Sequence, residues 1–177
     1  NALKETSGDM DAARTLLREK GLAAAGKRAE RATTEGLVLT AREGSTGAIV
    51  GLGCETEPVS KNDAFRAFGD TVIAAVTAGG SEAVDAFEAE RTELIATLGE
   101  NIVFAGAARY DGGTVGAYVH PPAHKIGVLV QLEGGSDELA RQLCMHIAFA
   151  APEYTTRDEV PAEAIEAEKQ IYLNSDE

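Results

Sequence analysis

One short pattern occurs twice in this chain, and it constrains the fold more than any other feature. Residues 47–53 (GAIVGLG) are similar to residues 127–133 (GVLVQLE), and each segment is followed by a stretch with the apolar spacing of an amphipathic helix. Short apolar runs of this kind, bounded by turn residues, are typical of strands. The repetition predicts two related α+β units.

The two copies differ in the length of the segment between the strand and the helix. Gly47 and Phe65 are 18 positions apart, whereas the matching residues Gly127 and Leu139 are 12 positions apart. The six additional residues of the first copy fall in the 54–59 region. A loop enlarged in only one of two related units is either a functional addition or ordinary variation in loop length, and both readings stay open at this point.

Hydrophobic periodicity and turn residues predict the other elements of the chain. We expect a hairpin over 36–54, helices over 60–77 and 81–98, a three-stranded meander over 101–132, a helix over 137–150 and a last helix that begins near Pro161. The apolar face of the 60–77 helix is expected to consist of Phe65, Phe68, Val72, Ile73 and Val76. The predicted fold class is α+β, with antiparallel sheets packed by helices in two related core subdomains.

These elements divide the chain into four parts. Residues 1–22 read as short helices, broken at Gly8, with Asp9 or Asp11 as the cap of the second helix and a stop at Lys20 and Gly21. The other parts are a linker over 23–35, a core N-subdomain over 36–100, and a core C-subdomain with the start of a following helix over 101–177. The first part is too small to hold a hydrophobic core alone.

Composition argues against several classes of partner. Lys and Arg total 16 and Asp and Glu total 29, so the net charge is −13. Phosphate backbones repel a chain this acidic, which predicts no nucleic acid as a partner and favours a basic or neutral protein. The longest apolar runs are strand-sized, which predicts no membrane association. Cys54 and Cys144 lie outside any CxxC pattern and are expected to be inert buried thiols in a reducing compartment.

The chain contains none of the common catalytic motifs GxSxG, HExxH and GxGxxG. A zinc alternative would draw on Cys144, His120, His124 and His146. These residues lack the paired spacing of zinc ligands. Glu55 and Glu57 suggest an acid–base pair of a hydrolase, but no histidine lies near them in the sequence to activate a nucleophile. The prediction is a protein that is not an enzyme, with no catalytic residue, no metal site and no cofactor.

Residues 47–65 (GAIVGLGCETEPVSKNDAF) resemble the core motif of translation elongation factor Ts, whose usual form contains N-C-E/Q-T-D-F-V-A-K/R-N-x-x-F. Other segments fit the same family in the same order: residues 8–21, 26–38 (GKRAERATTEGLV), 98–102 (LGENI), 126–130 (IGVLV), 146–148 (HIA) and 160–162 (VPA). The linker has the style of actinobacterial members. The resemblance covers essentially the whole chain without an unrelated insert.

The resemblance implies nucleotide exchange without covalent chemistry. Members of the family bind elongation factor Tu carrying GDP, loosen its Mg²⁺ and phosphate contacts and let GDP leave, so GDP-bound and nucleotide-free elongation factor Tu are the implied partners. By position, the loop directed at the Mg²⁺ side of the partner's nucleotide site consists of Thr56, Glu57, Pro58 and Val59. The implied helix contact is His146. The implied location is the cytoplasm, and a homodimer stays open.

The chain departs from the family pattern in the loop and at its ends. Glu57 stands where Asp is usual, and Pro58 stands where Phe is usual, which removes an aromatic wedge and fixes φ. The family's first N-terminal helix and its C-terminal part have no counterpart, so residues 1–22 are expected to be a remnant of a small helical, UBA-like domain. Two functions follow: an exchange factor, or an exchange-impaired module that holds the GTPase without efficient GDP release.

Two readings of His146 are also open. It lies in the centre of an apolar face of the predicted 137–150 helix, with Leu139, Leu143 and Ile147 as neighbours on that face. Periodicity alone therefore predicts a packed core histidine. The resemblance predicts a contact with the partner protein instead.

Overall fold

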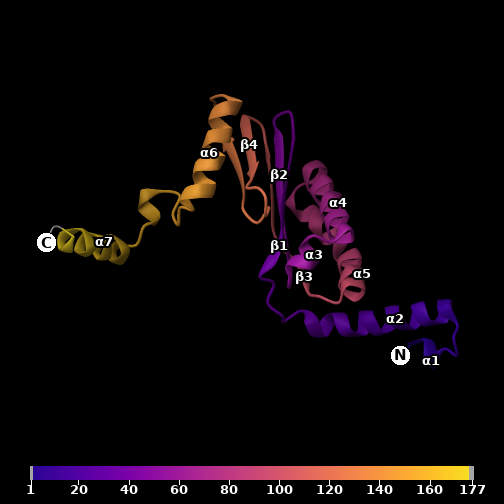
Figure 1. The fold of residues 1–177 in the computed structure, drawn as a ribbon. Coiled ribbons are helices and arrows are strands. Elements are labelled where there is room, and N and C mark those ends of the chain that lie inside the picture. The colour runs from indigo at the N-terminus through magenta and orange to yellow at the C-terminus, as the bar shows by residue number, and fades with distance from the viewer. Residues whose placement is uncertain (1, 176–177) are drawn as a thin grey trace.

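The computed structural model describes residues 2–175 of the chain and shows an α+β fold. Its centre consists of two stacked antiparallel sheets, with one long helix on the outer face of each (Figure 1). The first sheet has the strand order β1–β2–β3, and the second pairs β4 with β5. The bounds are β1 (Glu35–Glu43), β2 (Thr46–Cys54), β3 (Ile102–Asp111), β4 (Thr114–Val119) and β5 (Gly127–Leu132). Helix α4 (Asp63–Gly79) covers the first sheet and α6 (Asp137–Ala150) covers the second.

The first unit confirms the predicted hairpin and amphipathic helix. The five apolar residues expected on the helix face are all buried, and they form the main core together with alternate residues of β2: Ala48, Val50, Leu52 and Cys54. The helix begins at Asp63 because the Asn62 carboxamide oxygen accepts hydrogen bonds from Ala64 N and Phe65 N, at 2.9 and 3.4 Å.

Glycines allow the two sheets to approach closely. A β-carbon on Gly47 of β2 would overlap Val115 of β4 and would lie 3.0 Å from Leu129 Cδ1 of β5. A β-carbon on Gly127 would overlap Val38 of β1 in the same way. The central strand β2 is therefore covered on both faces, by α4 on one side and by β4–β5 on the other.

The predicted three-stranded meander over residues 101–132 is wrong. Strand β3 pairs with β2 along its whole length, from Thr46↔Asp111 to Cys54↔Ile102, and only β4 and β5 form the second sheet. The turn residues Gly112 and Gly113 both have positive φ, and Gly112 N bonds to Ser45 O at 3.1 Å. The turn therefore carries the chain from one sheet to the other. The subdomain boundary between residues 100 and 101 stays a prediction. Strand β3, which lies after that boundary, belongs to the first sheet.

The N-terminal segment contains α1 (Ala2–Glu5), α2 (Met10–Ala25) and the 3₁₀ turn η1 (Gly26–Arg28). The Asp9 carboxylate caps α2 as predicted, accepting from Asp11 N at 2.9 Å and Ala12 N at 3.0 Å. The predicted stop at Gly21 is wrong, because α2 continues to Ala25. A β-carbon on Gly21 would lie 2.9 Å from Ala96 O, so this glycine serves close packing of α2 on α5 rather than a helix end.

The remaining helices also refine the predictions. The expected 81–98 helix divides into a 3₁₀ segment η2 (Ser81–Phe87) and α5 (Glu88–Leu98), and no side-chain hydrogen bond caps the start of η2. The last helix, α7 (Ala162–Asn174), begins directly after Pro161, as predicted. It follows the 3₁₀ turn η3 (Arg157–Glu159) and extends away from the sheets (Figure 1). Among residues 2–175, no helix has both the length and the apolar character needed to cross a membrane.

Candidate functional site

The first unit has the longer connection between strand and helix, as predicted, although the connections differ by four residues rather than six because β2 is also longer than β5. Residues 55–62 connect β2 to α4, whereas residues 133–136 make the equivalent connection from β5 to α6. The longer connection contains one additional helical turn, α3 (Glu57–Ser60). Pro58 lies in the first turn of α3, where its missing N–H leaves no helical hydrogen bond unmade. We call residues 56–59 the 56–59 loop.

The 56–59 loop is anchored at both ends and exposed between them. Val59 is only 9% exposed and belongs to the main core, so its side chain holds α3 against the sheet. At the other end, the Thr56 hydroxyl donates a hydrogen bond to the Glu100 carboxylate. The side chains of Glu57 and Pro58 are exposed to solvent between these two anchors. The exposed pair therefore projects from a short helical turn with two fixed ends.

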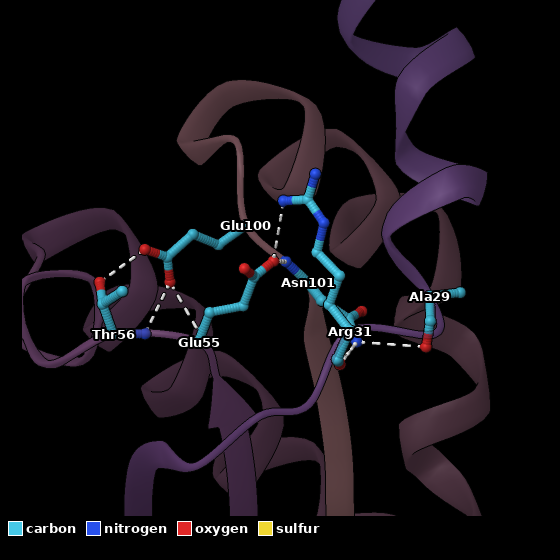
Figure 2. Close-up of polar contacts among 6 residues, drawn as sticks. All are labelled: Ala29, Arg31, Glu55, Thr56, Glu100 and Asn101. Atoms are coloured by element: carbon cyan, nitrogen blue, oxygen red, sulfur yellow. Dashed lines mark hydrogen bonds and ion pairs between the residues drawn. The ribbon is translucent and has the colours of Figure 1, made fainter.

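Glu100 holds the first anchor through three hydrogen bonds (Figure 2). Its Oε2 accepts from the backbone N–H of Glu55 at 3.1 Å and of Thr56 at 3.0 Å. Its Oε1 accepts from the Thr56 hydroxyl at 2.5 Å. Hydrogen bonds to a carboxylate are among the stronger ones in proteins. Glu100, which lies two residues before β3, therefore fixes the backbone just before α3.

Glu57 is held by its own helical turn. Its carboxylate lies 2.7 Å from Lys61 Nζ, and both side chains are more than half exposed. The hydrogen bond and the charge of Lys61 lower the pKa of Glu57 below its ordinary value, so the carboxylate is ionised at neutral pH. The loop therefore presents a negative charge paired with one adjacent lysine.

Both thiols lie in the packed interior, as the sequence predicts. Cys54 is fully buried at the end of β2, and Cys144 is fully buried on α6; neither forms a disulfide. Burial, together with the nearby Glu100 carboxylate, raises the pKa of the Cys54 thiol to about 11. Burial also raises the pKa of Cys144. Nucleophilic thiolate chemistry is therefore disfavoured at both positions.

His146 is exposed on the outer surface of α6, so the reading as a packed core histidine is wrong. The buried side of α6 consists of the small residues Ala140 and Cys144. A β-carbon on Gly116 of β4 would lie 2.8 Å from Ala140, which explains why only small residues fit on this side. Phe149, one turn after His146, is 91% exposed. The outward side of α6 thus carries an imidazole and an unburied phenyl ring.

The structure does not bring His146 and the 56–59 loop into one pocket. Helix α6 lies on the far side of the β4–β5 sheet from α3 and α4 (Figure 1). A partner that contacts both must therefore extend across the edge of the stacked sheets. The two predicted contact regions therefore do not form one enclosed small-molecule site.

The alternative chemical sites find no support in the side-chain contacts. Within the described range 2–175, no group of three or more His, Cys, Asp and Glu residues is arranged to hold a metal ion. The Glu55 carboxylate accepts from Asn101 N at 2.6 Å, and Glu57 pairs with Lys61. The two carboxylates of the proposed acid–base pair are thus each engaged in separate local contacts.

Comparison with known proteins identifies the family. The family model described as "Elongation factor TS" matches residues 55–177, which begin at the enlarged loop. The chain belongs to the elongation factor Ts family. It is 41% identical over 179 residues to elongation factor Ts of Sodalis glossinidius (strain morsitans), an alignment that covers 98% of this chain and 62% of that protein.

Other members of the elongation factor Ts family give the same result. Elongation factor Ts of Rhodospirillum rubrum is 42% identical over 193 residues, covering 96% of this chain and 62% of that protein. The Alkalilimnicola ehrlichii protein is 41% identical over 186 residues, covering 97% and 63% respectively. The chain therefore spans a little under two thirds of the length of these relatives.

Sequence reasoning missed Glu100 and Asn101 as residues that hold the loop. The segment 98–102 was part of the resemblance, but an acid after a helix end normally reads as a solvated turn residue. The sequence feature that could have indicated their role is Gly99, which ends α5 in the left-handed conformation with φ of 79°. Glu100 and Asn101 are the two residues between this helix end and β3. Phe149 was also missed, because its exposure depends on which side of α6 packs on the sheet.

Proposed function

We propose that this chain is a guanine-nucleotide exchange factor for elongation factor Tu, acting in the cytoplasm during translation elongation. It binds the GDP-bound and nucleotide-free forms of its partner and promotes loss of GDP and Mg²⁺ without covalent chemistry. The observation that carries the proposal is the exposed Glu57–Pro58 pair between two fixed anchors, in a chain of the elongation factor Ts family. The implied partner-binding loop, Thr56, Glu57, Pro58 and Val59, and the implied helix contact, His146, keep these roles as a proposal.

The physical basis of exchange is coupling between two ligands of the GTPase. A factor that binds nucleotide-free elongation factor Tu more tightly than the GDP-bound form must weaken GDP binding by the same ratio. A loop that keeps its shape on contact loses little conformational entropy, so more of the contact energy remains to favour the open state of the partner. The double anchoring of the 56–59 loop supports this role.

The residues of the loop divide the work according to their exposure. Glu57 and Pro58 are exposed and would touch the partner, whereas the buried Val59 holds the turn in place. Thr56 is also exposed, and its hydroxyl bond to Glu100 fixes the start of the turn. An ionised Glu57 near the Mg²⁺ side of the nucleotide site would compete electrostatically with the phosphates for the cation. His146, exposed on α6, would supply a second contact on the other side of the sheets.

Two features of the loop favour a second candidate function. Pro58 has no aromatic ring, and the Glu57 carboxylate is already paired with Lys61 at 2.7 Å. Both features reduce what the loop can insert into a partner. In this alternative, the chain holds the GTPase but releases GDP inefficiently.

One experiment separates these functions. Elongation factor Tu loaded with fluorescent GDP is mixed with the chain, and complex formation and GDP release are followed in the same sample. An exchange factor binds and accelerates release many-fold in proportion to its concentration until saturation. Binding without acceleration supports the alternative module, and absence of any complex contradicts both proposals. Duplex RNA serves as a specificity control, and the net charge of −13 predicts no complex with it.

A further inference from the structure

Three chain segments that are far apart in the sequence meet beside the 56–59 loop (Figure 2). They are the linker around residues 29–31, the end of the first hairpin at 55–56, and the residues 100–101 that lead into β3. The contact between the last two is reciprocal. Glu100 accepts from the backbone of Glu55 and Thr56, and Glu55 accepts from the backbone of Asn101. Each carboxylate therefore bonds to the backbone of the other segment.

Asn101 extends this junction to the linker. Its side chain is buried, with the residue 1% exposed, and its Nδ2 donates to Ala29 O at 3.3 Å and to Arg31 O at 2.8 Å. The Arg31 guanidinium lies 3.4 Å from Glu55 Oε1, which closes the network. The buried amide therefore fixes the linker backbone next to the residue that precedes Thr56.

The loop depends on this junction because α3 has no side-chain cap of its own. The Thr56 hydroxyl, which would normally bond back to the first helical turn, donates to Glu100 instead. Helix α3 is a single turn of four residues, too short to be stable on its own propensity. The direction in which it presents Glu57 and Pro58 is therefore set by Val59 on one side and by Glu100 on the other.

We propose that Glu100 is a positioning residue for nucleotide exchange, acting through Thr56 on the exposed Glu57–Pro58 pair, with Asn101 fixing the linker to the same junction. The proposal rests on the proposed function of the loop. Glu100 lies two residues before β3 begins, and its three hydrogen bonds are all made within the chain. Loss of these bonds leaves the contact residues present but no longer held in one orientation.

The test uses Glu100→Ala, Glu100→Gln and a matched control, Glu133→Ala. Alanine removes all three acceptor contacts. Glutamine keeps an oxygen for the two backbone N–H groups, and its amide can donate to the Thr56 hydroxyl oxygen. Glu133 is an exposed glutamate that follows β5 on the other sheet. All chains are compared well below their melting temperatures, so the folded fractions are equal.

The first measurement is the maximal rate of GDP release from elongation factor Tu at saturating concentrations of each chain, together with the affinity for the nucleotide-free partner. We expect Glu100→Ala to lower the maximal rate about ten- to a hundredfold, as misplacement of an acting group does. Affinity should fall by a smaller factor. Glu100→Gln should recover most of the rate, and Glu133→Ala should match the wild type. A normal rate for Glu100→Ala, or a loss that glutamine does not recover, overturns the proposal.

The second measurement needs no partner and keeps the two proposals distinguishable. Amide hydrogen exchange of Glu55 and Thr56 should be faster in Glu100→Ala than in the wild type, because the two N–H groups lose their acceptor. Glu133→Ala should leave both amides as protected as in the wild type. Unchanged protection in Glu100→Ala overturns the positioning role. A wild-type chain with protected amides and no GDP release contradicts the proposed function alone.

Discussion

Replacement of Gly47 by alanine tests whether the close stacking of the two sheets holds the molecule together. The new methyl group would overlap Val115 Cγ1, and it would lie 3.0 Å from Leu129 Cδ1. Val115 is fully buried, so the side chains cannot simply turn outward. Overpacking of this kind costs about 1–3 kcal/mol, which corresponds to a fall in melting temperature of about 2–12 °C for a chain of this length.

The matched control is Gly106→Ala in β3. Gly106 is exposed, and a β-carbon there would have no atom within 4 Å. Alanine at an open strand position is expected to stabilise the chain by about 0.5–1 kcal/mol, because it restricts the unfolded state. Urea unfolding of both variants, followed by circular dichroism, gives the two free energies directly.

The Gly47→Ala and Gly106→Ala variants also test function, because the two proposed contact sites lie on different sheets. Forcing the sheets apart shifts α6, and with it His146, relative to the 56–59 loop. We therefore expect Gly47→Ala to weaken binding to elongation factor Tu beyond what its unfolded fraction explains, and Gly106→Ala to leave binding unchanged. Equal stability of Gly47→Ala and Gly106→Ala would refute the argument that glycine at residue 47 is required by sheet stacking.

Four further predictions concern the proposed contact residues and the two buried thiols. His146→Ala should change the free energy of unfolding by less than about 0.5 kcal/mol, since the residue is exposed, and should weaken the complex by about 1–3 kcal/mol, which melting and titration of the same variant will show. Combining Pro58→Phe with Glu57→Asp should raise the rate of GDP release about ten- to a hundredfold with a smaller change in affinity, and stopped-flow rates equal to the wild type would exclude the loop as the cause of release. Cys54 and Cys144 should react with iodoacetamide at pH 8 on the order of a hundredfold more slowly in the folded chain than in guanidinium. Because burial raises the pKa of folded Cys54 to about 11, while an unfolded thiol ionises near about 8.5, stability should fall as the pH rises through this window.

Local periodicity predicted the elements whose burial is decided within one helix or hairpin. Phe65 and Val72 recur at helical spacing, and only one side of α4 could bury them. A cap at Asp9 or Asp11 could be predicted because the signal lies within three residues of the bond, and the structure shows that Asp9 makes it. The enlarged loop was visible because the repeated pattern supplied an internal reference length.

Long-range pairing was beyond the same reasoning. The glycines at 112 and 113 are equally compatible with a hairpin turn and with a crossing between two sheets. Which of the two forms depends on the pairing of β3 with β2, where Ile102 becomes fully buried. Pairing of residues so distant in sequence leaves no local pattern to read.

The orientation of α6 shows a second limit of pattern analysis. Counting large apolar residues placed His146 on the side facing the core. The helix packs instead through Ala140 and Cys144, because Gly116 of the facing strand leaves room for close contact only with small residues. The small-residue side of α6 is visible in the sequence, but the sheet that selects it is not.

The rate of GDP release from elongation factor Tu decides whether this chain is an exchange factor. Fluorescent GDP is bound to the partner, excess unlabelled GDP is added, and the loss of signal is recorded by stopped flow over a range of chain concentrations. For an exchange factor, we expect a release rate that rises with chain concentration to a plateau, and a lower plateau for Glu100→Ala than for Glu133→Ala. A release rate that stays at the spontaneous value while the complex demonstrably forms would contradict the claim that this chain is an exchange factor.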